Sequence, residues 1–130
     1  MMKAERLAGL EPASVFGYFE KICSIPHGSG NTKAISDYLV SFAKEHGLAY
    51  IQDELNNVLM FQDGTPGYED HEPVILQGHM DMVCEKSPDC SIDFAVDGLD
   101  VTHDDTCVFA NGTTLGGDDG IAVAYALALL

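Results

Sequence analysis

The sequence of 130 residues predicts an α/β domain in which helices alternate with short strands. Apolar residues recur at helical spacing near the N-terminus and again at the C-terminal end, while short apolar runs bounded by turn residues lie between them. Hydrophobic residues make up 46% of the chain, which is too many for a disordered tail. The length is that of one ordinary domain, and it is sufficient to bury a core.

Two amphipathic helices are expected first. Pro12 begins a helix over about residues 12–24, because a proline in the first turn lacks an N–H that would have no helical partner anyway. After a stretch rich in Gly and Ser, Asn31 or Thr32 can cap a second helix that runs to about residue 46. Gly47 is a typical residue for the end of that helix.

Strands are expected after Gly47. Residues 48–52 and 57–61 are two short apolar runs around a turn, and residues 63–72 have the composition of a solvated loop. Residues 74–77 include three successive apolar side chains, which is typical of a parallel strand buried on both faces. Residues 92–110 alternate weakly and predict short strands near an edge of the sheet.

The final helix is expected to begin near Gly120 and stays apolar to Leu130 without a C-cap signal. We therefore expect the chain to end inside a helix and to be part of a longer polypeptide. The apolar stretch is about half of the roughly 20 residues that cross a bilayer, so it predicts a buried helix. If that helix has lost partners, its apolar face makes self-association an expectation.

The charge excludes several classes of partner. There are 21 Asp and Glu residues against 6 Lys and Arg, giving a formal charge of −15, and such a surface repels phosphate groups. We expect neither nucleic acid nor a membrane as a partner. The four cysteines are too few and too irregularly spaced for a disulfide framework, and no signal peptide is visible. These features predict free thiols and a cytoplasmic protein.

His79 and Asp81 directly follow the predicted strand over residues 74–77, and ligands collect at the carboxyl ends of strands in open α/β sheets. An Asp two positions after a metal-bound His can accept the second N–H of the imidazole and orient the ring. A solvated strand end with an incidental His and Asp is the alternative.

Asp118 and Asp119 lie between glycines at the start of the final helix. Two carboxylates there can cap the helix and complement its dipole. Alternatively, the glycines allow the backbone to approach an ion, and one carboxylate bridges two metals. Residues 112–117 lack the Lys of a phosphate-binding P-loop, and residues 93–98 lack the spacing of an EF-hand.

The remaining cysteines and histidines predict no site. A zinc knuckle needs a close C-x₂-C pair, and none exists among Cys84, Cys90, His103 and Cys107. We interpret them as incidental thiols and an incidental histidine. His27 in a Gly-rich stretch and His71 in an acidic loop are interpreted as turn or surface histidines.

Together the two motifs resemble those of the cocatalytic zinc metallopeptidases of the aminoacylase and carboxypeptidase G2 type. The first motif is Val74-Ile-Leu-Gln-Gly-His79-Met-Asp81. The second is Gly112-Thr-Thr-Leu-Gly-Gly-Asp-Asp-Gly120, whose Asp118 lies 37 residues after Asp81 (118 − 81). Residues 21–27, 43–47 and 57–60 extend the likeness along nearly the whole chain. Within this family the sequence most resembles the aminoacyl-histidine dipeptidases, the Xaa-His dipeptidases or carnosinases of bacteria.

The resemblance implies a three-layer αβα catalytic domain with a mixed sheet flanked by helices. Residues 1–130 would be the N-terminal part of that domain, cut within the helix that starts near residue 120. The resemblance further implies that His79 is a terminal ligand of one Zn²⁺ and that Asp118 bridges two ions. Asp81 would be the catalytic-site carboxylate that orients His79 without binding metal. Asp119 would follow Asp118 across a cis peptide bond, at a position where the family often has Asn or Glu.

The implied reaction is the hydrolysis of Xaa-His dipeptides, such as β-alanyl-histidine, by water activated between two Zn²⁺ ions, for which Co²⁺ or Mn²⁺ can substitute. The general-base Glu and the other ligands would lie beyond residue 130. We therefore expect the 130-residue chain alone to be inactive and to bind zinc weakly at best. A related tripeptidase, an N-acyl-amino-acid deacylase and a non-catalytic module remain open alternatives.

Overall fold

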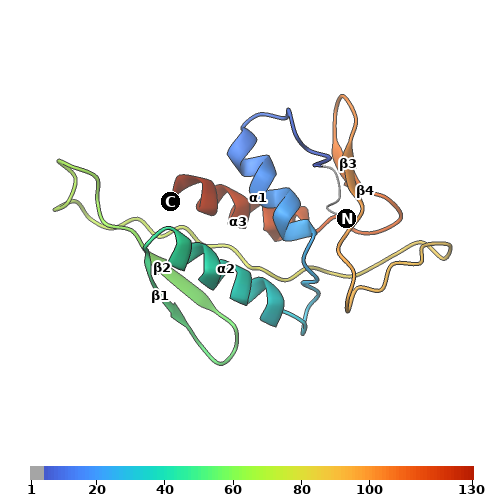
Figure 1. Cartoon of the computed structure of the whole chain (residues 1–130), viewed down its shortest axis with the longest axis horizontal. Helices are drawn as coiled ribbons and strands as arrows, with labels where there is room; N and C mark the ends of the chain where they lie inside the picture. The colour runs from blue at the N-terminus through green and yellow to red at the C-terminus, as the bar shows by residue number, and fades with distance from the viewer. Residues whose placement is uncertain (1–4) are drawn as a thin grey trace.

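Two helices, two short strand pairs and a final helix follow one another along residues 5–130, the part of the chain that this computed structural model describes (Figure 1). In chain order the elements are α1 (Ala13–Cys23), α2 (Lys33–Glu45), β1 (Ala49–Gln52), β2 (Val58–Phe61), β3 (Val101–His103), β4 (Val108–Ala110) and α3 (Gly117–Leu129). The predicted mixture of helices and strands is confirmed, as are the two N-terminal helices and the hairpin after Gly47. Within residues 5–130 the strands form two separate antiparallel pairs, β1–β2 and β3–β4.

α1 packs against α3 and forms the centre of the core (Figure 1). The apolar residues of α1 recur at helical spacing, so that Val15, Phe19 and Ile22 are buried on one face. Gly120 lets the two helices come close together, because a Cβ there would lie 3.3 Å from Cε2 of Phe19. The predicted final helix is confirmed, and its buried face contacts α1 rather than solvent.

α2 covers one face of the β1–β2 hairpin. The hydroxyl of Ser36 in α2 donates to the carbonyl of Asn56 at 2.9 Å and accepts from Nε2 of Gln52 at 2.8 Å, which ties the helix to the hairpin. Side chains alternate between the two faces of a strand, and the face that carries Ile51, opposite Leu59, is turned away from α2. That face is uncovered, since both side chains are more than half exposed.

β3 and β4 form a short hairpin in register Val101↔Ala110 and His103↔Val108. The backbone N–H of Leu99 donates to the carbonyl of Cys23 at 2.8 Å and joins the start of this hairpin to the end of α1. The short strands predicted within residues 92–110 are confirmed at β3 and β4, whereas residues 92–98 form none.

The strand predicted at residues 74–77 is wrong for the described chain. Residues 72–81 are assigned no strand, and Val74 and Ile75 are 83% and 88% exposed. An inner strand becomes a strand only when neighbouring strands bond its edges and helices cover its faces. Residues 5–130 place no strand beside this segment, so it crosses the molecule as an extended but unpaired chain (Figure 1).

All four cysteines are free thiols, as predicted. Cys23 is buried at the end of α1, and this burial raises the pKa of its thiol to about 12. Among the helices of residues 5–130, none has the length and apolar character needed to cross a membrane.

Candidate functional site

The chain that follows the exposed segment is anchored on the turn after α1. The N–H of Met82 donates to the carbonyl of His27 at 3.0 Å, and the N–H of Ser29 donates to the carbonyl of Met82 at 3.1 Å. Gly28 permits this close approach, because a Cβ there would lie 2.7 Å from Sγ of Cys84. Buried Met82 therefore fixes the position of the three residues before it.

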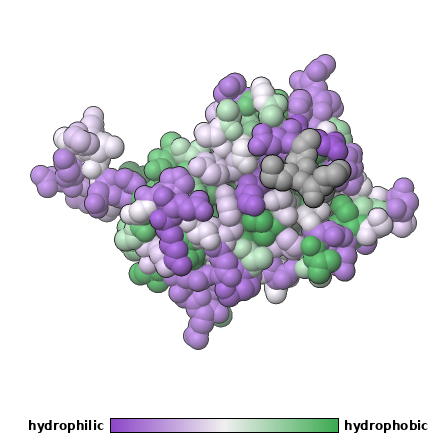
Figure 2. Space-filling view, in the orientation of Figure 1, coloured by the Kyte–Doolittle hydropathy of each residue, from purple (hydrophilic) through white to green (hydrophobic). Residues whose placement is uncertain are grey.

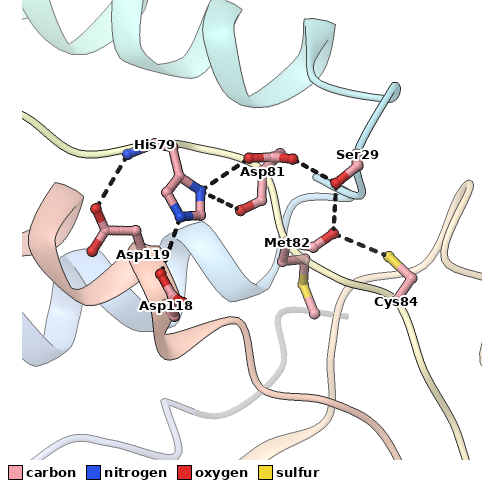
Figure 3. Close-up of polar contacts among 7 residues, drawn as sticks. All are labelled: Ser29, His79, Asp81, Met82, Cys84, Asp118 and Asp119. Carbon is pink, nitrogen blue, oxygen red and sulfur yellow. Dashed lines mark hydrogen bonds and ion pairs between the residues drawn. The ribbon is translucent and has the colours of Figure 1, made fainter.

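His79 lies between two carboxylates (Figure 3). Its Nδ1 is 2.9 Å from Oδ1 of Asp81, and its Nε2 is 3.0 Å from Oδ1 of Asp118. The structure thus brings together all three predicted site residues, although Asp118 is 39 positions away in the sequence. With both ring nitrogens engaged, the imidazole has one defined orientation.

Asp118 and Asp119 depart from helical geometry at the start of α3, where Gly116 has a positive φ of 72°. The peptide bond between the two residues is cis, as the resemblance implies. Oδ2 of Asp119 accepts from the backbone N–H of His79 at 3.3 Å (Figure 3). No side chain caps this helix, so helix capping does not account for the Asp pair.

Asp81 has a second partner that the sequence analysis did not identify. The hydroxyl of Ser29 donates to Oδ2 of Asp81 at 2.5 Å, and this bond, supported by His79, lowers the pKa of the Asp81 carboxyl (Figure 3). On the other side, the hydrogen bond to Asp118 is the largest cause of the raised pKa of His79. Ser29, Asp81, His79 and Asp118 therefore form one continuous chain of hydrogen bonds.

His27 corrects one interpretation. It lies in the turn, as expected, but it is only 3% exposed and is therefore not a surface histidine. Its Nδ1 lies 2.6 Å from the carbonyl of Ile25, and its buried Nε2 has no hydrogen-bond partner within residues 5–130. Burial lowers the pKa of His27. His71 is exposed in its loop, as expected.

The donor set fits part of a zinc site. Imidazole nitrogen and carboxylate oxygen are both zinc ligands, and a zinc-bound histidine commonly donates its other N–H to a carboxylate, as His79 can to Asp81. The Asp118 side chain is 95% exposed, so it is open to a further ligand or ion. Nowhere in residues 5–130 do three or more His, Cys, Asp or Glu side chains gather as a metal cluster.

The described residues also leave the candidate site open to solvent. Two hollows on the surface are lined by residues near the start of α1 and by residues of the 89–101 region, and neither includes His79, Asp81 or Asp118. The side chain of His79 is 54% exposed. These residues therefore provide polar groups that are open to solvent.

Two known proteins are similar to this chain, one by sequence and one by sequence and structure. The cytosol non-specific dipeptidase of Escherichia coli (strain K12) is 43% identical over 124 residues, which are 95% of this chain and 26% of that protein. The crystal structure of the aminoacylhistidine dipeptidase from Vibrio alginolyticus matches with a TM-score of 0.91 at 41% identity, over 95% of this chain and 25% of that one. No protein-family model matches the chain.

The comparisons confirm the resemblance to the aminoacyl-histidine dipeptidases and the predicted fold class of a peptidase domain. The chain spans about a quarter of the length of each of these two relatives.

Proposed function

We propose that this chain supplies one side of a two-zinc centre in a peptidase that hydrolyses Xaa-His dipeptides. The observation that carries the proposal is the position of His79, which is held by Asp81 at Nδ1 and directs Nε2 at Asp118. The dipeptidases to which the chain is similar support the same reaction class. His79 is then the terminal ligand of one ion, Asp118 the bridging ligand and Asp81 the residue that positions His79.

Each residue of the group has a separate task in this proposal. Asp81 accepts a hydrogen bond from the Nδ1–H of His79, which holds the neutral ring in the tautomer whose Nε2 lone pair can bind a metal ion. Asp119 fixes the backbone of His79 by accepting its N–H, and Ser29 fixes Asp81. Zinc bound at such a site supplies Lewis acidity that lowers the pKa of water and polarises a scissile carbonyl.

The proposal requires residues from outside this chain. Zinc ions are held firmly by about three or four protein ligands each, and residues 5–130 bring together one histidine nitrogen and one bridging carboxylate. The general base and the remaining ligands then come from further polypeptide, so the 130-residue chain alone has no dipeptidase activity. Co²⁺ or Mn²⁺ can replace zinc, and the name of the Escherichia coli relative supports a cytosolic location.

A chimera tests this proposal, with this chain replacing the matching quarter of the Escherichia coli dipeptidase. We expect the chimera to hydrolyse Xaa-His dipeptides with added Zn²⁺, while the purified 130-residue chain shows no hydrolysis. Asp118→Ala should lower kcat/KM of the chimera at least about a hundredfold, since metal catalysis contributes several kcal/mol and each 1.36 kcal/mol is tenfold in rate. Glu69→Ala, in the exposed loop, is the matched control. Full activity of the Asp118→Ala chimera would refute the bridging role.

A dipeptidase of broader specificity is the second candidate, and the name of the Escherichia coli relative, a non-specific dipeptidase, favours it. Rates of hydrolysis by the chimera and by its unaltered parent distinguish the candidates. The substrates to compare are Xaa-His dipeptides, other dipeptides, a tripeptide and an N-acetyl amino acid. A shift of the chimera toward Xaa-His substrates supports the narrower specificity. Turnover of the acylated amino acid or the tripeptide alone would instead support the deacylase or the tripeptidase.

A further inference from the structure

Hydrophilic residues cover much of the face shown in Figure 2, and within residues 5–130 two polar side chains are buried, those of Ser36 and His27. The hydroxyl of Ser36 is satisfied by its bonds to the hairpin. Nε2 of His27, in contrast, is the one buried side-chain nitrogen or oxygen of the described residues that has no hydrogen-bond partner. An unpaired buried polar atom costs about 1–3 kcal/mol, so a histidine at this position lowers stability.

The ring of His27 has one defined orientation. Its Nδ1 lies 2.6 Å from the carbonyl oxygen of Ile25, and because a carbonyl oxygen only accepts, the proton of the neutral ring is on Nδ1. Burial also lowers the pKa of His27, which favours the neutral ring. Nε2 therefore carries a lone pair and lies in the interior of the molecule.

Nε2 of His27 lies beside Gly116, the N-cap residue of α3. It is 3.3 Å from the position that a Cβ on Gly116 would take, and the same position is 3.0 Å from Sδ of Met82. Gly116 has a positive φ of 72°, a conformation suited to glycine. The ring of His27 and the side chain of Met82 are therefore both packed against the start of α3.

His27 thus contacts both segments that carry the candidate site. Its carbonyl oxygen accepts the N–H of Met82 at 3.0 Å, and Met82 lies three residues after His79. Its ring lies against Gly116, two residues before Asp118. The distance of 3.0 Å between Nε2 of His79 and Oδ1 of Asp118 depends on how these two segments are placed relative to each other.

We propose that His27 is a positioning residue of the candidate site. Its ring keeps residues 79–82 and the start of α3 at the separation at which Asp118 meets His79. His27 acts through Met82 and Gly116 and is not itself a ligand. Proteins accept a local cost in stability mainly at functional sites, which accounts for the unpaired Nε2. The effect on catalysis rests on the proposed function, whereas the effect on the geometry of the site does not.

Two substitutions separate the two parts of the ring. His27→Asn keeps an N–H near the position of Nδ1, which can donate to Ile25, but removes the part of the ring beside Gly116. His27→Phe loses the donor and keeps a ring. In the free 130-residue chain, a nuclear Overhauser contact between the ring of His79 and the β protons of Asp118 reports the geometry without metal. We expect this contact in the wild type and in His27→Phe, and its loss in His27→Asn.

Persistence of the contact in a folded His27→Asn chain would overturn the proposal, and so would its loss in both variants. Gly116→Ala tests the same packing from the other side, and it decides the matter if His27→Asn does not fold. The added Cβ pushes against His27 and Met82, so the contact should be lost, and its persistence would refute the proposal. Gly112→Ala is the matched control, because Gly112 also has a positive φ of 73° and a crowded Cβ position, beside Cys90 instead.

The chimera extends the test to catalysis. His27→Asn should lower kcat for Xaa-His dipeptides at least about tenfold, because small displacements of catalytic groups are costly, and should change KM less than about twofold. His27→Phe should restore kcat. Val40→Ala, at a buried side chain of α2, controls for a general loss of stability and should keep kcat. An equal loss of kcat in Val40→Ala would contradict a positioning role.

The two readouts also separate this inference from the proposed function. If the contact between His79 and Asp118 responds as expected but no chimera hydrolyses a peptide, the positioning role stands and the proposed function fails. If the contact and kcat are both unchanged in His27→Asn of an active chimera, the positioning role fails and the proposed function stands.

Discussion

His79 is the residue whose surroundings carry most of the functional argument. One ring nitrogen faces the carboxylate of Asp81 and the other faces that of Asp118. The resemblance of the two motifs to a known family singled out these residues from the sequence, and the structure places them together. Ser29 was not identifiable, because its hydroxyl reaches Asp81 across 52 positions and only the docking of Met82 on the turn brings them together.

Removing the hydroxyl of Ser29 tests whether it positions Asp81. Ser29→Ala should weaken Zn²⁺ binding by the chimera about tenfold, the lower range for loss of a group that orients a metal ligand. Ser29→Thr keeps the hydroxyl and should restore the affinity, while Ser14→Ala on the exposed side of α1 should have no effect. Competition with a chelator measures the zinc affinity. Equal affinities of the Ser29→Ala and unaltered chimeras would show that Asp81 does not need the hydrogen bond from Ser29.

His27 predicts a pH dependence of stability. Burial lowers its pKa in the folded state, whereas in the unfolded state it titrates near the ordinary value of about 6.5. Below that pH the unfolded state binds a proton that the folded state does not, so the free energy of unfolding falls as the pH decreases. His27→Gln should reduce this fall between pH 7.5 and 5.5 in urea unfolding, and His71→Gln should not. An unchanged pH dependence in His27→Gln would contradict the role of burial.

At the scale of elements, local pattern predicted each helix, the β1–β2 hairpin and short strands within residues 92–110, but it failed at residues 74–77. The helices and the hairpins find their partners within residues 5–130, as α1 does on α3 and β1 does on β2. The apolar run at residues 74–77 predicted a buried inner strand, and this prediction is wrong for residues 5–130. No strand of the described residues pairs with it, and no local pattern reports whether neighbouring strands are present.

The packing of α1 on α3 predicts the largest stability effect. Phe19 is 2% exposed and lies against Gly120, so Phe19→Ala should lower the free energy of unfolding by about 3–5 kcal/mol. Leu55→Ala, at a side chain that is 76% exposed, should change it by no more than about 0.5 kcal/mol. Urea unfolding of the wild type and the two variants gives the free energies of unfolding to compare. Similar losses in Phe19→Ala and Leu55→Ala would show that Phe19 is not in the core.

At the scale of the whole molecule, the chain spans about a quarter of the length of each of its two relatives. Residues 5–130 bring the ring of His79 against the carboxylate of Asp118 and leave Val74 and Ile75 exposed, with no strand paired to them. The formal charge of −15 is spread largely over solvated loops, and Asp81, Asp118 and Asp119 are the carboxylates gathered at the candidate site.

The central claim is that His79 and Asp118 are ligands of a two-metal centre. It is tested most directly by the zinc content of the chimera after dialysis against metal-free buffer. We predict two zinc ions per chimera and a loss of bound zinc in both His79→Ala and Asp118→Ala, with Glu69→Ala unchanged. Two tightly bound ions in the His79→Ala and Asp118→Ala proteins would contradict the account.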